Sequence, residues 1–425
     1  MKISRREFLQ KAAVATAAAG LMVGCGGSGG SASVAATPVP TPSPTPTPTP
    51  EPPYDADVLT GEPRAPGAKN SRIIGVMINN MANTSYQNAR PQRGLSSAKM
   101  LIEIKVEGGI TRFCALFDDV DDIPELGPIR SGRDQFLQLL IPWQAVYYHD
   151  GESVFCTRFI KDWEYWDYNL GGKTWFNTPT HSIVSHRNSR GRSVAYEHTE
   201  FTSGEEIQKA IDNADIDMYR EYRSTFFIFA DYRYNEYNML DDGEAAVSVT
   251  IRHSSSYRTY FDYDAATDTY KMSQYSPATK SISDTVDELN DEQLRFTNLV
   301  VLFTAIQAYP GDSHDIQDVD YDFGGIGYYF TGGRCKLIGW RKGSPGSGLC
   351  LYDYEAGEDE SIVLNVGKTY LTVVDLDEYD YFSWSNGIDD GNGDDLSDAD
   401  DMSNVTDNAD DAETSEDAAG AISTN

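Results

Sequence analysis

Short apolar runs and polar turn segments alternate along the middle of the chain. Residues 72–78 form a continuous apolar run with β-branched side chains, which is typical of a buried strand, and the run ends at the turn signal Asn79-Asn80. Residues 101–106 alternate between apolar and charged side chains, as a half-buried strand does. Gly108-Gly109 follows at the place of a two-residue hairpin loop, and residues 110–117 return as a second strand. The pattern therefore predicts a β-hairpin next to a buried strand.

A two-glycine loop would fix which side chains share a face of this hairpin. It predicts that Lys105 lies opposite Arg112, that Glu107 lies opposite Ile110, and that Glu103 joins the same charged face. Glu103 and Glu107 would then lie ~13 Å apart along the strand, beyond the ~5–9.5 Å between the two carboxylates of a glycosidase. The sequence therefore favours ion pairs of these glutamates with Lys105 and Arg112 over a role in glycoside hydrolysis.

Helical segments are interspersed with strands in this half of the chain. Residues 132–142 carry an apolar stripe at helical spacing. Ser203, with Glu206 three residues later, forms a capping box that predicts the start of a short helix. Residues 145–149 predict a strand that ends at a glycine-containing turn. We therefore expect a mixed α/β sheet domain at 54–242.

The second half of the chain contains repeated short segments of aromatic and β-branched residues. Clusters of Gly, Asp, Asn and Pro separate these segments, as in antiparallel β-domains. The predicted strands are 247–251, 259–263, 268–272, 299–304, 327–330, 335–340, 348–354, 362–366 and 370–374. The whole pattern predicts an α+β fold, in which a mostly antiparallel β domain at 243–376 follows the mixed domain.

The first 25 residues resemble a lipoprotein export signal. Basic residues precede a 12-residue apolar run, which is too short to span a bilayer. Ser4-Arg5-Arg6 resembles a twin-arginine signal, with general secretion as the other route. Small residues lead directly to Cys25, as in a lipobox. We therefore expect 1–25 to be the signal and Cys25 to be lipidated; an ordinary cleaved secretory peptide is the alternative.

A spacer is predicted between the lipid anchor and the folded body. Residues 26–53 consist of a Gly/Ser-rich stretch and a Thr-Pro repeat, and the 17 residues of the repeat favour an extended polyproline II conformation. At ~3.1 Å per residue the repeat spans roughly 50 Å. We expect the protein at the outer face of the bacterial cytoplasmic membrane, with the lipid anchor as its only contact with the bilayer.

The charge of the chain excludes one class of partner. The formal net charge is −32, whereas nucleic-acid-binding proteins carry a basic footprint. Asp375–Asn425 holds 17 acidic and no basic residues, and we expect 377–425 to be an acidic, disordered tail. The five cysteines form no C-x-x-C pair and the histidines have no known ligand spacing, so neither a metal nor a cofactor is predicted.

Two cysteines are candidates for a disulfide. Cys335 and Cys350 lie in adjacent predicted strands of an exported domain. A bond that closes a loop of this length contributes ~3 kcal/mol to stability. Two buried thiols are the alternative.

Arginines near glycine-containing turns are the main candidates for a binding site. Arg130 and Arg133 flank Ser131-Gly132, just before the helix predicted above. Backbone amides at the start of a helix and forked guanidinium groups suit a carboxylate or a phosphate. The predicted anion-binding residues are Arg90, Arg112, Arg130, Ser131, Arg133 and His149. The alternative is that these arginines brace loops by donating to carbonyls and internal carboxylates.

Several motifs, taken in order, resemble the YerB-like family of bacterial lipoproteins. The first half contributes Leu59–Pro63, Val76–Asn80, Ala89–Gln92, Glu107–Phe113, Gly127–Ser131 and His149. The second half contributes Asn298–Val301, Tyr328–Phe330, Trp340–Lys342 and Leu364–Thr369. The resemblance covers about residues 57–376 and implies a two-domain surface lipoprotein. It implies no catalytic mechanism, because the biochemical function of that family is not established.

These features together predict a membrane-anchored, extracytoplasmic binding module without catalytic activity. Its expected partner is a cell-wall component or an envelope protein, bound at the arginine-rich face. The alternative is a cell-wall-polymer hydrolase or transferase that uses His149 or a carboxylate as its base. Asp150 and Ser153 stand next to His149, but sequence neighbours rarely form a triad, and residues 151–155 lack the closing glycine of a nucleophile elbow.

Overall fold

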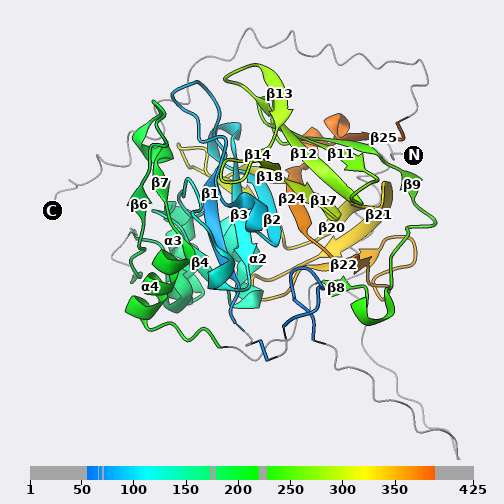
Figure 1. Cartoon of the computed structure of the whole chain (residues 1–425), viewed down its shortest axis with the longest axis horizontal. Coiled ribbons are helices and arrows are strands. Elements are labelled where there is room, and N and C mark those ends of the chain that lie inside the picture. Colours follow the sequence, from blue (N-terminus) through cyan, green and yellow to red (C-terminus); the bar gives the residue numbers. More distant parts are fainter. Residues whose placement is uncertain are drawn as a thin grey trace, which may run out of the picture.

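The central element of the fold is a large β-sheet to which both halves of the chain contribute (Figure 1). The computed structural model describes residues 55–387 except 66, 69–70, 173–174, 176–178 and 220–226. The strand order of the large sheet is β22-β21-β20-β17-β24-β2-β3-β1-β4-β5, and β9 pairs with β21. The first half provides β1 (Ile74–Asn79), β2 (Met100–Lys105), β3 (Thr111–Phe117), β4 (Val146–Tyr148) and β5 (Asn169–Leu170). The second half provides β9 (Glu244–Ala245), β17 (Asn298–Thr304), β20 (Gly325–Thr331), β21 (Arg334–Arg341), β22 (Cys350–Asp353) and β24 (Thr369–Asp375).

Strand β24 joins the two halves of the molecule. It lies between β2 and β17 and runs parallel to both, with Thr369 level with Met100 on one side and with Asn298 on the other. All residues of β24 are buried. Buried backbone amides need partners on both sides, so the two ladders of β24 tie the end of the folded chain to its beginning.

A smaller antiparallel sheet covers one face of the large sheet. Its strand order is β13-β12-β11-β10-β25, with β16 also paired to β12. Phe261 and Met272 of this sheet share a buried apolar cluster with Val301 and Phe330 of the large sheet. The bounds are β10 (Ser248–Arg252), β11 (Arg258–Asp264), β12 (Thr269–Ser276), β13 (Ser281–Asp284), β16 (Arg295–Phe296) and β25 (Ser383–Ser385).

Two helices, α2 and α3, cover the opposite face of the large sheet. Leu137 of α2 (Asp134–Leu140) and Ile160 of α3 (Val154–Asp162) share a second apolar cluster with Ile102 and Leu116. The third helix, α4 (Gly204–Ala214), starts at Ser203 as predicted, because the Ser203 side chain accepts from the backbone N–H of Glu206. Helices α2 and α3 therefore lie on one face of a mixed sheet. The antiparallel β layer lies on the other face together with α4, whose Ile207 and Ile211 belong to the cluster of Phe261 and Val301, and this arrangement confirms the predicted α+β class.

Shorter elements complete the fold. Four two-stranded ribbons are β6 (His186–Arg187) with β7 (Glu200–Phe201), β8 (Ile228–Phe229) with β23 (Val363–Leu364), β14 (Val286–Asp287) with β15 (Glu292–Gln293), and β18 (Ile306–Ala308) with β19 (Gln317–Val319). The 3₁₀ turns are η1 (Leu95–Ser97), η2 (Glu107–Gly109), η3 (Val120–Asp122), η4 (Ile141–Trp143), η5 (Tyr165–Tyr168), η6 (Tyr196–His198), η7 (Tyr232–Tyr234) and η8 (Leu376–Tyr381).

The β2–β3 hairpin forms as predicted, but its register differs by one residue. The loop has three residues, Glu107–Gly109, and it is closed by the N–H of Val106 donating to the carbonyl of Ile110. Lys105 therefore lies opposite Thr111, and Arg112 lies opposite Ile104. The predicted pairing of Lys105 with Arg112 is wrong. A slip of one residue moves Arg112 to the opposite face of the sheet from Glu103.

The predicted disulfide between Cys335 and Cys350 is wrong. Neither cysteine is part of a disulfide. Cys335 is buried near the start of β21, whereas Cys350 pairs with Arg341 at the end of that strand. Six residues of strand separate the two positions by ~20 Å, and a disulfide requires Cα atoms within ~7 Å.

Several predictions fall at the chain ends. The signal 1–25 with Cys25, and the spacer 26–53, lie outside the described residues. The start of the tail predicted at 377–425 is corrected, because η8 covers its first residues and Ser383–Ser385 pairs with β10 as β25. Residues from 388 onwards lie outside the described part of the chain. No helix within the described residues is long and apolar enough to cross a membrane.

Candidate functional site

Two of the predicted anion-binding arginines bind an anion that belongs to the chain itself. Arg112 Nη2 lies 2.8 Å from Glu107 Oε1, and Arg133 Nε lies 2.9 Å from Glu107 Oε2. Only 1% of Arg112 and 3% of Arg133 is exposed. Burial alone would raise the pKa of Glu107, but the two guanidinium groups hold it well below its ordinary value. Glu107 is therefore an ionised carboxylate that is bound to both arginines.

Ser131 and His149 lie next to this ion cluster. Arg112 Nη1 donates to the carbonyl of Ser131 over 2.6 Å, and Arg133 Nη1 donates to the carbonyl of Gly132 over 2.8 Å. The His149 ring packs so closely on Gly132 that a Cβ there would lie 3.0 Å from three ring atoms. The structure thus brings together four of the six predicted residues, in a buried layer between β3, β4 and α2.

His149 is fully enclosed by its own neighbourhood. Its side chain is 0% exposed. Nδ1 lies 2.6 Å from the carbonyl oxygen of Gly151, and Nε2 lies 2.8 Å from Asn169 Oδ1 and 3.6 Å from Glu152 Oε2. Both ring nitrogens are therefore engaged with groups of the protein.

Arg90 and Arg130 occupy different surroundings. Arg90 Nε donates to the carbonyl and to Oδ1 of Asn80, over 3.1 and 2.9 Å, and Arg90 Nη1 donates to the carbonyl of Tyr275 over 2.9 Å. Arg90 thus fastens a loop of the first half to β12. Arg130 is half-buried, and its backbone bridges Met77 and Asp150.

Glu103 forms a second buried polar centre, between the two sheets. Its carboxylate accepts hydrogen bonds from Thr111 (2.7 Å), Thr259 (2.9 Å) and Tyr370 (2.7 Å). Burial favours the neutral acid, but nearby His253 and the hydroxyl donors lower the pKa of Glu103 to about 2. The predicted ion pairs of Glu103 with Lys105 and Arg112 are wrong, because Lys105 instead pairs with Asp375 at 2.7 Å and Arg112 lies on the other face.

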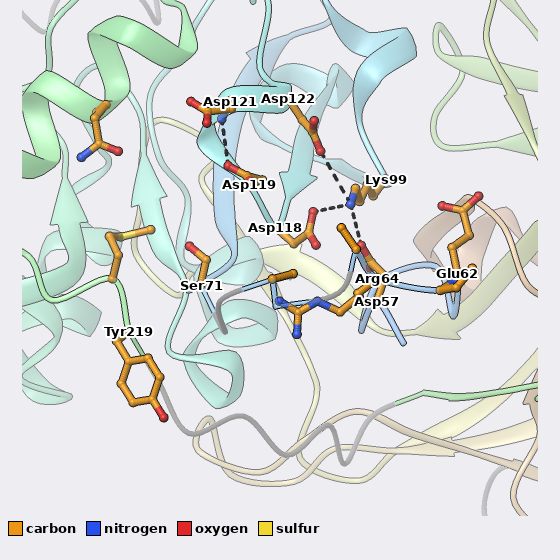
Figure 2. Close-up of a pocket in the computed structure, with 15 residues that line it drawn as sticks. Asp57, Glu62, Arg64, Ser71, Lys99, Asp118, Asp119, Asp121, Asp122 and Tyr219 are labelled. Carbon is orange, nitrogen blue, oxygen red and sulfur yellow. Dashed lines mark hydrogen bonds and ion pairs between the residues drawn. The ribbon is translucent and has the colours of Figure 1, made fainter. Parts of the chain in front are cut away.

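The structure contains an acidic cavity that the sequence analysis did not single out (Figure 2). Its volume is about 670 Å³, within the ~300–1,000 Å³ range of ligand pockets. The segment that begins the described chain, the turn η3, and α4 form its walls. Its lining residues are Asp57, Glu62, Pro63, Arg64, Ala65, Ala68, Ser71, Lys99, Asp118, Asp119, Asp121, Asp122, Gln208, Met218 and Tyr219. A second hollow of about 490 Å³ along α4 shares Asp121 and Gln208 with it.

Lys99 stands at the centre of the carboxylates of this cavity (Figure 2). Its Nζ lies 2.5 Å from Asp57 Oδ2 and 3.7 Å from Asp122 Oδ2, and it also contacts Asp118. Burial and the neighbouring Asp57 raise the pKa of Asp118 to about 7. Burial acts against ionisation of Asp57 too, but Asp118 and Lys99 hold its pKa below the ordinary value. The Asp57–Asp118 pair therefore releases its second proton only near neutral pH.

Negative charge predominates in the cavity. Six carboxyl groups line it, against two basic side chains, and one of these, Arg64, pairs with Asp55 at 3.4 Å. Asp119, Asp121 and Asp122 are exposed. The run Asp118-Asp119-Val120-Asp121-Asp122 was visible in the sequence as a signal, whereas the approach of Lys99 and Asp57 required the fold. Among the described residues, no group of three His, Cys, Asp or Glu side chains is arranged to hold a metal ion.

The fold and these polar centres define a two-part α+β protein with a shared central sheet. Residues 59–223 match the N-terminal domain, and residues 247–371 the C-terminal domain, of the family described as protein of unknown function DUF3048. The chain belongs to this family, and the predicted YerB-like relationship is confirmed.

Two comparisons with individual proteins agree with this assignment. The chain is 25% identical to the Bacillus subtilis (strain 168) protein named "Putative lipoprotein YerB" over 295 residues, which is 67% of this chain and 77% of that protein. The crystal structure of the YerB protein from Bacillus subtilis superposes with a TM-score of 0.61 and 22% identity. It covers 78% of this chain and 99% of the YerB chain, so both halves of the fold are shared.

Proposed function

We propose that this protein is a membrane-anchored, extracytoplasmic lipoprotein that binds a cell-wall component or an envelope partner without catalysing a reaction. The lipobox that ends at Cys25 supports the anchor, and so does the similarity to a protein named as a lipoprotein. The folded body begins about thirty residues after Cys25, which leaves the Thr-Pro spacer to bridge the distance from the membrane.

The ligand group is proposed to be a cation, bound in the acidic cavity. The observation that carries this proposal is the excess of carboxylates around a hollow of about 670 Å³. Lys99 is shared between Asp57, Asp118 and, at 3.7 Å, Asp122, so its single charge leaves most of the negative charge of the exposed rim aspartates uncompensated. An ammonium group of a wall peptide, or a lysine side chain of a partner, would gain charge-assisted hydrogen bonds there.

The proposed ligand has the opposite charge to the one predicted from the arginines. Arg112 and Arg133 are buried and bound to Glu107, so an external anion would have to displace an internal carboxylate. Such a displacement would leave Glu107 buried and unpaired, which is costly. The rim aspartates need no such rearrangement.

A binding experiment with a charge-matched control tests the proposal. The chain from residue 26 onwards is titrated by calorimetry with peptidoglycan fragments that carry free amino groups, and with the same fragments after N-acetylation. We expect binding of the free amines only, weakened at least about tenfold by Asp119→Asn, Asp121→Asn and Asp122→Asn together. The control carries the same charge change at the exposed Asp241, Asp262 and Asp359 and should bind normally. Equal binding of acetylated fragments would overturn the proposal.

A second candidate function is hydrolysis or transfer on a wall polymer by a carboxylate. The observation that favours it is the carboxyl pair in the cavity, in which the pKa of Asp118 is raised to about 7 and that of Asp57 is lowered, because two carboxyls with separated pKa values suit general acid–base catalysis. His149, the other candidate base, is enclosed. New products released from peptidoglycan by the native chain, and lost in Asp118→Asn, would establish this function in place of simple binding.

A further inference from the structure

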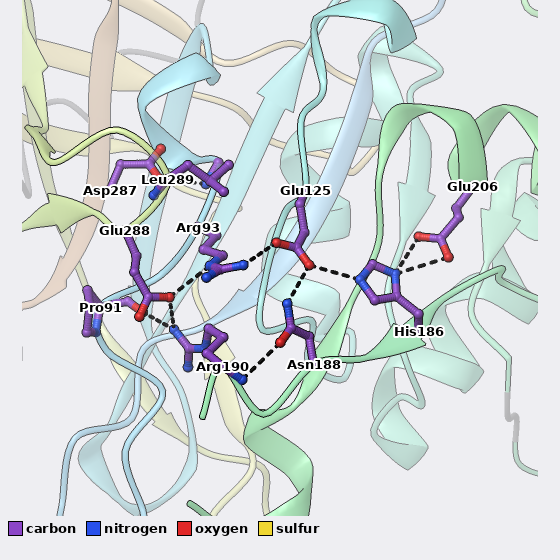
Figure 3. A network of polar contacts seen from close by, with 11 residues as sticks. Pro91, Arg93, Glu125, His186, Asn188, Arg190, Glu206, Asp287, Glu288 and Leu289 are labelled. Atoms are coloured by element: carbon purple, nitrogen blue, oxygen red, sulfur yellow. Dashed lines mark hydrogen bonds and ion pairs between the residues drawn. The ribbon is translucent and has the colours of Figure 1, made fainter. Parts of the chain in front are cut away.

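A chain of polar contacts runs from Glu288 in the second half of the molecule through Arg93 and Glu125 to Glu206 of α4 (Figure 3). At its centre is His186 of β6. Nε2 of His186 lies 3.0 Å from Glu125 Oε1, and Nδ1 lies 2.9 Å from Glu206 Oε2 on α4. An ionised carboxylate can only accept hydrogen bonds. Both ring nitrogens must therefore carry a proton, so the geometry requires an imidazolium between two glutamates.

The partner strand carries a second group that titrates near neutral pH. Glu200 of β7 lies opposite Arg187 in the ribbon and pairs with it at 2.9 Å. Burial and the neighbouring Asp150 raise the pKa of Glu200 to about 7. Ser185 donates to Glu200 over 2.6 Å. The β6–β7 ribbon thus places two titratable groups on adjacent strands.

The segment between these strands holds other parts of the molecule in place. A tight turn closes where the N–H of Arg192 donates to the carbonyl of Ser189 over 2.9 Å. From this turn, Arg190 donates to the carbonyls of Pro91 and Ala89, and Arg192 donates to the carbonyl of Asn88 over 3.3 Å.

The same turn reaches the second half of the chain. Arg190 pairs with Glu288 at 3.0 Å, next to the β14–β15 ribbon. Arg93 joins Glu288 at 2.9 Å and also contacts Glu125, so the path of ion pairs returns to His186 (Figure 3). The turn 189–192 therefore binds both segment 88–91 of the first half and Glu288 of the second half.

We propose that the β6–β7 ribbon is a pH-sensitive latch, which is closed in acid and releases the turn 189–192 from segment 88–91 and Glu288 as the pH rises through neutral. The latch is independent of the ligand proposed for the cavity. A histidine suits this role at the cell surface, because its charge changes within the range of environmental pH.

The titrations of His186 and Glu200 both weaken the closed ribbon as the pH rises. Burial alone would lower the pKa of His186, but Glu125 and Glu206 raise it above the ordinary value. Its contribution is therefore present at low pH and is lost as the pH rises through the raised pKa. Once His186 is neutral, Glu125 and Glu206 face one ring that has a single proton to donate.

Glu200 acts in the same direction as His186. When it ionises it faces Asp150, although Arg187 compensates part of the charge. The remaining groups around His186 are Phe201 of β7, which packs on the ring, and Asn188 and Arg93, both bound to Glu125. Of these, only Arg93 is charged, and it keeps its charge over this pH range. These groups therefore contribute equally at both ends of this pH range, and the change with pH comes from His186 and Glu200.

Hydrogen exchange of the full chain tests the latch. Amide protection of peptides from 186–201 and 88–93 is measured at about pH 5.5 and about pH 8.5, corrected for intrinsic exchange. We expect protection to fall about tenfold or more between these values, while peptides of β17 and β24 keep theirs. In His186→Gln we expect low protection of 186–201 already at about pH 5.5. The control His314→Gln alters an exposed histidine on another loop and should behave as the native chain.

The outcomes separate the latch from a static ion-pair network. Constant protection of 186–201 in the native chain would overturn the proposal, and so would an unchanged pH response in His186→Gln. If His186→Gln does not fold, the imidazole of His186 is titrated by NMR in the native chain. A pKa at or below that of His314 would then also overturn the latch.

Discussion

The phenol of Tyr370 donates a 2.7 Å hydrogen bond to the carboxylate of Glu103, and both side chains are completely buried. Glu103 belongs to β2 in the first half of the chain, and Tyr370 belongs to β24 at the end of the second half. Thr259 of the smaller sheet donates to the same carboxylate. One ionised group therefore binds three segments that lie far apart in the sequence, and its donors specify how the halves dock.

Removing the Tyr370 hydroxyl tests this arrangement. Tyr370→Phe keeps the ring but leaves the buried Glu103 carboxylate with one donor fewer. We expect the free energy of unfolding to fall by about 1–3 kcal/mol, measured by urea denaturation. The control, Tyr381→Phe, removes a hydroxyl from an exposed ring and should change stability by less than about 0.5 kcal/mol. Equal effects of the two variants would show that the Glu103 centre does not hold the halves together.

The sequence predicted local structure better than side-chain partners. The predicted strand at 370–374 and the cap at Ser203 are confirmed, because periodicity and capping depend on neighbouring residues. The partners of Glu103 were missed, because Thr259 and Tyr370 come from segments more than 150 residues away. The predicted register of the hairpin was wrong by one residue. Gly108-Gly109 is equally compatible with a three-residue turn and with a two-glycine loop, and the loop length decides which face of the sheet Arg112 occupies.

The candidate site shows the same limit. The convergence of Arg112, Arg133 and His149 could be anticipated from their positions near turns. The ion pair of Arg112 with Glu107 was predicted and forms, but the sharing of that carboxylate with Arg133 was not predicted, since it depends on where the turn places Glu107. The acidic run at 118–122 could be recognised in the sequence. The cavity that it lines exists only because Asp57 and Lys99 meet it from other segments.

Glu107 is expected to be the main electrostatic support of the β2–β3 turn. Glu107→Gln removes the carboxylate that pairs with the buried Arg112 and Arg133, so we expect a loss of about 3–5 kcal/mol at neutral pH. Because the folded pKa of Glu107 lies below its ordinary value, its contribution is present above the ordinary pKa and disappears as the pH falls. The difference between the native chain and the variant should therefore shrink in acid. Denaturation curves at several pH values measure this, with Glu360→Gln at an exposed site as the control.

The free thiols predict that stability does not depend on redox conditions. Cys335 and Cys350 are ~20 Å apart along β21, so among the four cysteines of the described residues no disulfide has to be broken or formed on folding. We expect the melting temperature to be the same with and without a reducing agent. Alkylation of the folded protein should modify Cys350 before Cys114, Cys156 or Cys335, which are buried. A reductant-dependent melting temperature would contradict the strand register.

Asp134, at the start of α2, is a carboxyl group whose burial reduces stability. Its side chain is 0% exposed and accepts a 2.6 Å hydrogen bond from Tyr309. Burial raises the pKa of Asp134 to about 6, so the folded state binds a proton more tightly than the unfolded chain does. The stability contributed by this proton is lost as the pH rises past the ordinary pKa and up to about 6.

Asp134→Asn removes this titration and keeps an oxygen that can accept from Tyr309. We expect the variant to be more stable than the native chain by about 1–2 kcal/mol near pH 8, since part of the gain is offset by the new amide donors. Near pH 4 the two proteins should have the same stability, because the native carboxyl is then protonated in the folded state. The exposed Asp359→Asn should show no such pH-dependent difference. The free energy of unfolding is measured by urea denaturation at both pH values. If Asp134→Asn is stabilised equally at both, or is less stable than the native chain near pH 8, burial does not hold Asp134 as a neutral acid.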